Sequence, residues 1–176
     1  MLVSVITPAY NAEQFIGEAI ESVISQTFQN WEMIVVDDSS TDSTSSIVSQ
    51  YATRDNRIRF IQKQKNEGPA VARNIALCKA KGRYIAFLDS DDLWVSEKLE
   101  IQLDFMQQND ISFCFTDYKR ISGVDGHYIN TIYMPETITY KQYLKNTIIG
   151  TSTTVIDKTA TGFFEMPVIR SSQDMA

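Results

Sequence analysis

Short apolar runs alternate with amphipathic segments over most of the chain. Five of these runs are rich in β-branched or aromatic residues and have the length of buried strands. They cover residues 2–7, 33–36, 57–61, 84–88 and 111–115. Most are followed by a polar turn and then by apolar residues at the three- and four-residue spacing of one helix face. This order predicts an α/β fold whose mostly parallel sheet is covered by helices on both faces.

Helix-breaking and capping residues predict where these elements begin and end. Pro8 is expected to end the first strand, and Asn11 is a suitable N-cap for the helix that follows. Pro69 suits the first turn of a helix that runs to about Ala80, and Ser96 suits the N-cap of the next helix. The turns after the strands are therefore expected along one edge of the sheet, where the carboxyl ends of parallel strands meet.

The second half of the chain has a different pattern. Residues 118–133 alternate apolar and polar positions around a glycine-containing turn at 123–126, which predicts a hairpin. A short helix is predicted over residues 139–146 and a strand over residues 152–156. The chain then stops at Ala176 without a closing element, which indicates a single domain that is cut short.

Composition excludes several classes of protein. With 176 residues, 43% of them hydrophobic, the chain can form one domain with a real core and is not disordered. No apolar run approaches the ~18 residues of a membrane span, and the N-terminus lacks the features of a signal peptide. The net charge of −6 argues against a nucleic-acid binder. Cys78 and Cys114 are expected to be reduced core thiols of a cytoplasmic protein, and His127 to be a surface residue.

Two predicted strands end in clusters of carboxylates. Asp37 and Asp38 follow the second strand, and the sequence Asp-Ser-Asp-Asp follows the fourth at residues 89–92. Ligands of open parallel sheets bind at the carboxyl ends of the strands, near the point where the strand order reverses. Five carboxylates at that edge repel one another, and Mg²⁺ or Mn²⁺, which prefer oxygen ligands, would relieve the repulsion. Either cluster alone would be equally typical of a turn or a helix cap.

Two further segments are expected at the same edge. The loop at residues 8–11 carries Tyr10, which could stack on a nucleobase or pack within the turn. Residues 66–74 open a helix whose N-terminus favours anions. Arg73, in that helix, could contact a base or a phosphate, and a surface salt bridge is an equally good interpretation.

Taken together, these segments resemble the family 2 glycosyltransferases, which have the GT-A fold. The resemblance rests on five motifs, which occur in the right order at residues 3–11, 25–32, 35–42, 66–74 and 84–92. The ordered set is highly specific, although any one motif alone would be weak. It implies a Rossmann-like GT-A domain over residues 1–176, in which residues 1–117 bind a nucleotide sugar and residues 118–176 face the acceptor.

The resemblance also implies roles for individual residues in binding the donor. The donor would be a nucleotide-diphosphate sugar, commonly linked to UDP, whose sugar is transferred to an acceptor hydroxyl with inversion. Pro8, Tyr10 and Asp38 align with positions that hold the nucleobase in the family. Arg73 aligns with a contact to the base or phosphate, and Asp89 with the ribose part of a DxD-type motif.

The same resemblance implies a divalent metal, Mn²⁺ or Mg²⁺, and a catalytic base. Asp91 or Asp92 would bind the metal, and the sequence does not separate the two. The family's base is the acidic residue of a Glu-Asp pair that precedes a helix. Asp174 occupies that place here, although Gln173 replaces the usual glutamate. The metal would neutralise the leaving diphosphate, while the base removes the proton of the acceptor hydroxyl.

The expected acceptor is a saccharide or a lipid-linked saccharide of bacterial surface polysaccharide synthesis. The protein is then expected in the cytoplasm, with peripheral association at the cytoplasmic face of the membrane, and with no nucleic-acid partner. An alternative, motivated by the chain end at Ala176, is a module that binds the nucleotide sugar without turnover. A dinucleotide-dependent enzyme is disfavoured because no G-x-G-x-x-G follows the first strand.

Overall fold

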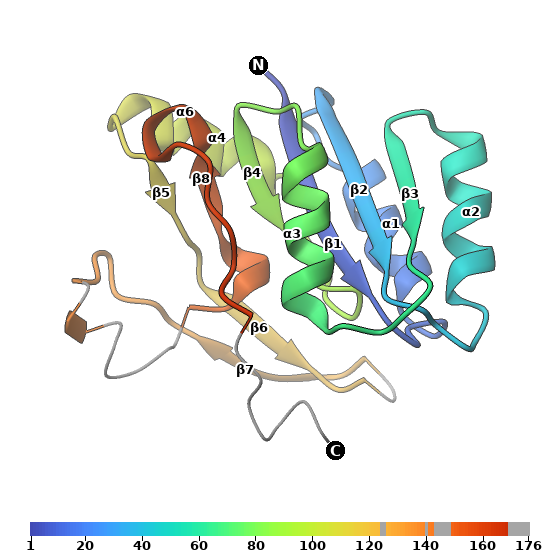
Figure 1. Ribbon diagram of the computed structural model, residues 1–176. Helices are drawn as coiled ribbons and strands as arrows, with labels where there is room; N and C mark the ends of the chain where they lie inside the picture. Colours follow the sequence, from blue (N-terminus) through green and yellow to red (C-terminus); the bar gives the residue numbers. More distant parts are fainter. Residues whose placement is uncertain (124–125, 140, 143–148, 169–176) are drawn as a thin grey trace.

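The structure is a computed structural model, which describes residues 1–123, 126–139, 141–142 and 149–168. Its centre is a six-stranded sheet (Figure 1). The strand order is β3-β2-β1-β4-β8-β5. The strands are β1 (Val3–Ala9), β2 (Trp31–Asp37), β3 (Ile58–Gln62), β4 (Tyr84–Phe87), β5 (Phe113–Cys114) and β8 (Val155–Asp157). The first four strands of that order run parallel, and β8 is antiparallel to both of its neighbours. The predicted α/β class with a mostly parallel sheet is confirmed.

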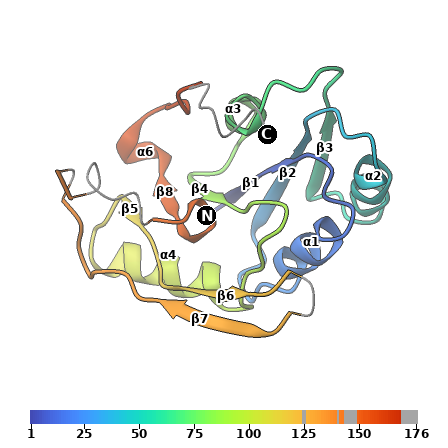
Figure 2. The same ribbon diagram turned by 90° about the horizontal axis from the view of Figure 1, so that it is seen from below.

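Helices cover both faces of this sheet (Figure 2). They are α1 (Ile16–Ile24), α2 (Thr44–Arg54), α3 (Pro69–Lys79) and α4 (Lys98–Gln108), with a short α6 (Lys158–Thr161) after β8. The buried residues of α1, α2 and α4 pack on one face, and those of α3 pack on the other. Along β1, Val5 belongs to the first of these cores and Ile6 to the second. The sequences of these strands are continuous apolar runs because both faces of the parallel sheet are buried.

The first strand is longer than predicted. It continues through Pro8 to Ala9, whereas Pro8 was expected to end it. Pairing with β4 stops at Ile6, so beyond that residue β1 has only β2 as a neighbour. A proline, which has no N–H to donate, is tolerated where one side of a strand is unpaired.

The two predicted N-caps are wrong. Asn11 has a φ of 47°, in the left-handed region, and α1 begins only at Ile16. Its side-chain oxygen instead accepts a hydrogen bond from the backbone N–H of Thr41, at 2.9 Å. Ser96 lies before the start of α4, and its hydroxyl donates to the carboxylate of Glu97 rather than capping the helix. Both side chains therefore hydrogen-bond to groups other than the helix N–H groups that the sequence predicted as their partners.

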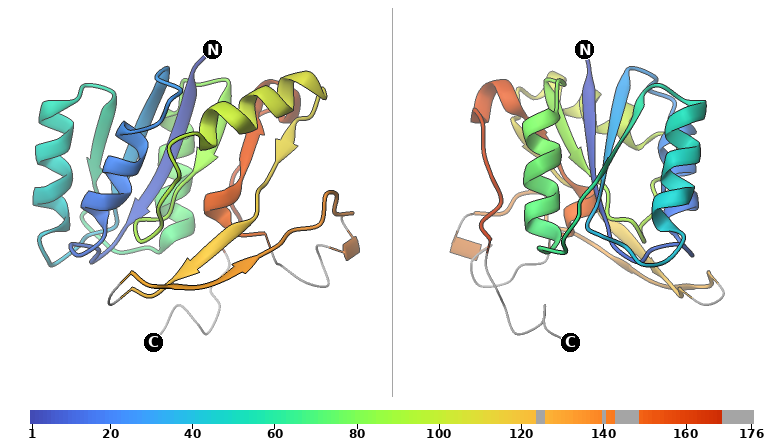
Figure 3. Two further views of the ribbon diagram at one scale, coloured as in Figure 1. Left: turned by 180° about the vertical axis from the view of Figure 1, so that it is seen from behind. Right: turned by 45° about the vertical axis from the view of Figure 1, so that its right-hand side comes forward.

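The second half of the chain contributes to two sheets. The predicted hairpin is confirmed as β6 (Tyr118–Ile121) and β7 (Tyr128–Ile132), which form a separate two-stranded sheet (Figure 3). The strand predicted over 152–156 begins later, at β8, after a 3₁₀ turn over Thr151–Thr153. Most of the helix predicted over 139–146 lies outside the described residues.

Several smaller expectations can be compared with the structure. Cys114 is buried as expected, but Cys78 is exposed on α3 and is not a core thiol. His127 is exposed, as predicted. Across the described part of the chain, no helix is both long enough and apolar enough to pass through a bilayer.

Asp157 fastens β8 to the sheet through an ion pair with Arg83. The guanidinium nitrogens of Arg83 lie 2.7 and 3.0 Å from Oδ2 of Asp157, while the backbone N–H of Thr159 donates to Oδ1 at 2.9 Å. The hydrogen bonds from Arg83 lower the pKa of Asp157 to about 2, although burial opposes this, and the bonds from Thr159 add to the shift. The charged carboxylate is therefore the form that the fold favours.

Replacing Asp157 by asparagine should remove the charge and keep an acceptor for Thr159. We expect Asp157→Asn to lower the free energy of unfolding at pH 7 by about 1 kcal/mol, because the partner arginine is half exposed. The stabilisation is complete above about pH 4 and is lost as the pH falls toward about 2, so the deficit of the variant should shrink across that range. Urea unfolding of both proteins from pH 7 to pH 2 measures this, with the exposed Asp104→Asn as control. A deficit that does not change with pH would contradict it.

Candidate functional site

A cavity of about 390 Å³ opens at the carboxyl end of the sheet. It lies where the strand order reverses, because the chain builds β1, β2 and β3 outward and then returns to place β4 on the other side of β1. Such a reversal leaves a crevice between the loops that leave the two central strands. The wall brings together six of the predicted site residues: Pro8, Tyr10, Asp38, Arg73, Asp89 and Asp91.

A larger hollow of about 610 Å³ lies over α1 and shares no lining residue with this cavity. Its wall contains Glu13, Glu18 and Glu21, and no lysine or arginine among the described residues. None of the predicted site residues lines it. Because all the charged side chains in its wall are glutamates, this hollow suits an anionic ligand less well than the cavity at the strand ends.

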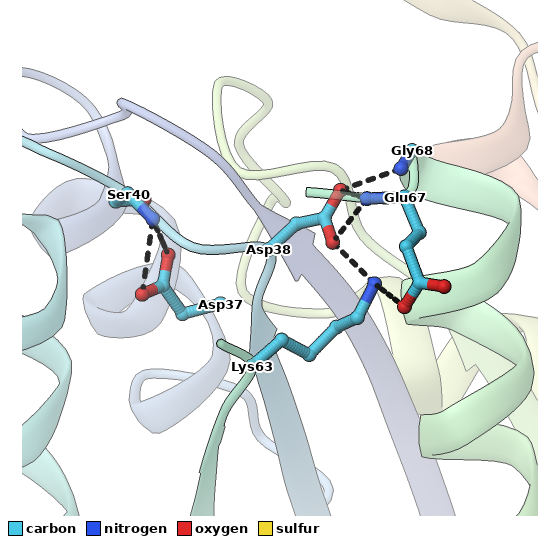
Figure 4. A network of polar contacts seen from close by, with 6 residues as sticks. All are labelled: Asp37, Asp38, Ser40, Lys63, Glu67 and Gly68. Atoms are coloured by element: carbon cyan, nitrogen blue, oxygen red, sulfur yellow. Dashed lines mark hydrogen bonds and ion pairs between the residues drawn. The ribbon is translucent and has the colours of Figure 1, made fainter. Parts of the chain in front are cut away.

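Asp38 is held by the loop that leads into α3. Its carboxylate accepts hydrogen bonds from the backbone N–H groups of Glu67, at 3.1 Å, and Gly68, at 2.7 Å, and from the ammonium of Lys63, at 2.5 Å (Figure 4). Gly68 has a φ of 90°, a conformation that side chains disfavour, and this turn directs both N–H groups at the carboxylate. Asp38 is only 2% exposed, so these donors replace most of its water.

Asp37, the neighbouring carboxylate, does not line the cavity, and its side chain points away from that of Asp38 (Figure 4). It accepts hydrogen bonds from the backbone N–H of Ser40, at 3.2 Å, and from the hydroxyl groups of Ser40 and Ser45. Since Ser45 lies in the first turn of α2, this aspartate joins the end of β2 to the start of that helix. Asp37 therefore has the structural role, in a turn and at a helix start, that the sequence allowed as an alternative to ligand binding.

Arg73 and Asp89 form an ion pair in the wall of the cavity. Nη2 of Arg73 lies 2.5 Å from Oδ1 of Asp89, and the arginine side chain is only 14% exposed. The pair bridges α3 and the end of β4. The salt bridge that the sequence allowed for Arg73 is therefore present, but in the cavity and not on an open surface.

Asp91 and Asp92, inseparable in the sequence, differ in the structure. Asp91 lines the cavity, is exposed, and has no hydrogen-bond or ion-pair partner within the described part of the chain. Asp92 does not line the cavity, and it accepts a hydrogen bond from the hydroxyl of Ser152. Loss of water around the carboxyl group, and then the charges of Asp89 and Asp91, raise the pKa of Asp92, which the bond from Ser152 opposes.

The repulsion that led us to expect a metal is therefore largely relieved within the chain. Four of the five carboxylates have donors of their own: Asp37, Asp38, Asp89 and Asp92. No three His, Cys, Asp or Glu side chains of the described ranges come together as a metal site. Mg²⁺ and Mn²⁺ nevertheless need only one or two carboxylates when phosphate oxygens complete their shell, and Asp91 fits that requirement.

Ser152 and Asn74 are partners that the sequence did not reveal. The hydroxyl of Ser152 accepts from the backbone N–H of Asp89, at 3.0 Å, and donates to Asp92. Asn74 makes two hydrogen bonds to the backbone of Met166, at 2.7 and 2.9 Å, and so ties the C-terminal part of the chain to α3. All of these contacts join residues 60 or more positions apart, and no local pattern indicates them. Asp174, the predicted base, lies outside the described residues.

Removing the hydroxyl of Ser152 should loosen the loop over residues 89–92. We expect Ser152→Ala to lower the free energy of unfolding by about 1 kcal/mol, because the backbone N–H of Asp89 and the carboxyl of Asp92 both lose a partner. Urea unfolding measures the change, and Ser46→Ala, at an exposed position of α2, is the control. Equal stability of the two variants would contradict this role.

Residues 4–167 match the family described as glycosyl transferase family 2. The chain is 51% identical over 176 residues to TuaG of Bacillus subtilis, and the matched region covers 99% of this chain and 69% of TuaG. The name of TuaG describes a glycosyltransferase of teichuronic acid biosynthesis. It is 44% identical over 168 residues to WfgD of Escherichia coli, named as a UDP-Glc:α-D-GlcNAc-diphosphoundecaprenol β-1,3-glucosyltransferase.

Solved structures show the same fold. The crystal structure of S. aureus TarS 1–349 superposes with a TM-score of 0.77 at 28% identity, over 99% of this chain and 53% of that one. Its complex with UDP-GlcNAc superposes with a TM-score of 0.74 at 27% identity. The chain spans 65% of the length of WfgD and about half of that of TarS.

Proposed function

The chain belongs to glycosyl transferase family 2, and on that premise we propose that it transfers a sugar from a UDP-linked donor to a lipid-linked saccharide in the synthesis of a bacterial surface polysaccharide. The observation that carries the proposal is the cavity at the strand-order reversal, which presents different chemistry at its two ends. One end has an aromatic ring beside a buried carboxylate, and the other has an arginine with two carboxylates.

The first end suits a nucleobase. Tyr10 is half exposed and offers a ring for stacking, next to the rigid ring of Pro8. Asp38 offers an acceptor for a base N–H, such as that of uracil. TarS, whose crystal structures include complexes with UDP and with UDP-GlcNAc, supports a uracil base in this chain.

The second end suits ribose and diphosphate. Asp89 can accept from a ribose hydroxyl, and Arg73 beside it can donate to a phosphate, close to the N-terminus of α3. Asp91 is the residue proposed to hold Mn²⁺ or Mg²⁺, in preference to Asp92, because only Asp91 has its carboxylate free in the cavity wall. When bound, the cation would neutralise negative charge on the leaving diphosphate.

The acceptor side belongs to the second part of the chain. Asp174 is proposed as the base that removes the proton of the acceptor hydroxyl, so that a single displacement inverts the anomeric centre. Residues 1–117 would then hold the donor and residues 118–176 the acceptor. The name of WfgD, which specifies a diphosphoundecaprenol substrate, supports a lipid-linked acceptor and peripheral association with the cytoplasmic face of the membrane.

A transfer assay on the full-length protein tests the proposal. UDP-sugars, Mn²⁺ and a diphosphoundecaprenol-linked saccharide are the substrates, and product is followed by mass spectrometry. We expect Asp91→Asn to reduce kcat/KM by about 100-fold or more and Asp174→Asn to reduce kcat by about 10²- to 10⁴-fold. Asp92→Asn should lose far less, and the exposed Asp104→Asn should match the wild type.

Two results would contradict parts of this account. Binding of UDP without transfer to any acceptor would favour the alternative of a module that holds the donor without turnover. Full activity of Asp91→Asn together with loss in Asp92→Asn would reverse the assignment of the metal ligand.

A further inference from the structure

We propose that Lys63 determines which nucleobase the site accepts, by holding Asp38 as a fixed and charged hydrogen-bond acceptor. The inference rests on the proposed function, because it concerns the base of the donor. Lys63 does not itself line the cavity, so it acts through Asp38 as a positioning residue.

The position of Lys63 is set by the sheet. It follows the last residue of β3, and its backbone N–H donates to the carbonyl of Asp37 at 2.9 Å, which continues the pairing of β3 with β2. The side chain is only 8% exposed, and its ammonium lies 2.5 Å from Oδ1 of Asp38 and 3.1 Å from Oε2 of Glu67 (Figure 4). A lysine this buried needs charged partners, and Asp38 is the buried one of the two.

The hydrogen bonds of Asp38 leave little freedom. A carboxylate offers about four acceptor positions, and here three donors already use it: the ammonium of Lys63 and the N–H groups of Glu67 and Gly68. All three come from the loop between β3 and α3. About one acceptor position is left for a ligand, and Asp38 lines the cavity in which a ligand would bind.

This arrangement has a consequence for base selection. An ionised carboxylate only accepts hydrogen bonds, whereas a protonated acid also donates. A fixed, charged Asp38 therefore selects a base whose facing edge donates an N–H, such as uracil, and rejects one whose corresponding atom accepts, such as cytosine. An acceptor edge placed against a carboxylate leaves both groups without a donor, which is costly in a buried site. Without the ammonium, the carboxyl group could turn and would discriminate less between the two bases.

Calorimetric titration of the full-length protein with UDP and with CDP, both in the presence of Mn²⁺, tests the inference. In Lys63→Met, we expect UDP to bind about tenfold more weakly, the cost of about one charge-assisted hydrogen bond, while the affinity for CDP changes less. The ratio of the two affinities should therefore narrow. Lys65→Met, two residues away at an exposed position, should keep the wild-type ratio, and Lys63→Arg, which retains the charge, should restore most of it.

The outcomes separate this inference from the proposed function. If Lys63→Met binds both nucleotides more weakly by the same factor, or keeps the wild-type ratio, Lys63 has only a structural role and the inference is overturned. Wild-type protein that binds neither nucleotide would overturn the proposed function, and the inference with it. If Lys63→Met does not fold, Lys63→Gln replaces it, because glutamine keeps a hydrogen-bond donor without the charge. The ratio of the UDP affinity to the CDP affinity is expected to narrow in this variant as well.

Discussion

At the carboxyl end of the sheet, the carboxylates of Asp37 and Asp38 are buried where little water reaches them, and each needs donors from the chain. Asp38 takes its donors from the loop before α3, Asp89 takes one from Arg73, and Asp92 takes one from the hydroxyl of Ser152. Burying a carboxylate without such partners would be costly. The hydrogen bonds that these carboxylates accept also fix the loops around the cavity. The shape of the site therefore follows from the donors that its buried charges require.

The same requirement joins parts of the chain that are distant in sequence. Ser152, in the 3₁₀ turn before β8, contacts the loop after β4, and Asn74 of α3 contacts Met166. Strand β8 itself lies between β4 and β5. The part of the chain proposed to face the acceptor is thus built into the sheet that is proposed to hold the donor. Of the five aspartates at the ends of β2 and β4, Asp91 alone has a carboxylate without a partner among the described residues, and it lines the cavity where an incoming ligand can use it.

Much of the fold could be predicted because its signals are local. The apolar runs of β1 to β4 and the turn at residues 123–126 are visible in the sequence, and the parallel direction of those four strands follows from their alternation with helices. The start of α3 at Pro69 was predicted correctly, whereas the N-caps of α1 and α4 were mispredicted because Asn11 and Ser96 hydrogen-bond to groups other than the helix ends. Six of the residues predicted for the site line one cavity, since parallel strands deliver their ends to one edge. Lys63 and Ser152 could not be found, because their contacts depend on how distant segments meet.

The central claim is that the base end of a nucleotide sugar lies against Asp38 and the diphosphate end against Arg73 and Asp91. A crystal structure of the full-length protein with a UDP-sugar and Mn²⁺ tests it most directly. The account predicts uracil beside Tyr10 with its N–H directed at Asp38, and the metal on Asp91 between the protein and the diphosphate. A nucleotide in the hollow over α1, or a base that makes no contact with Asp38, would contradict it.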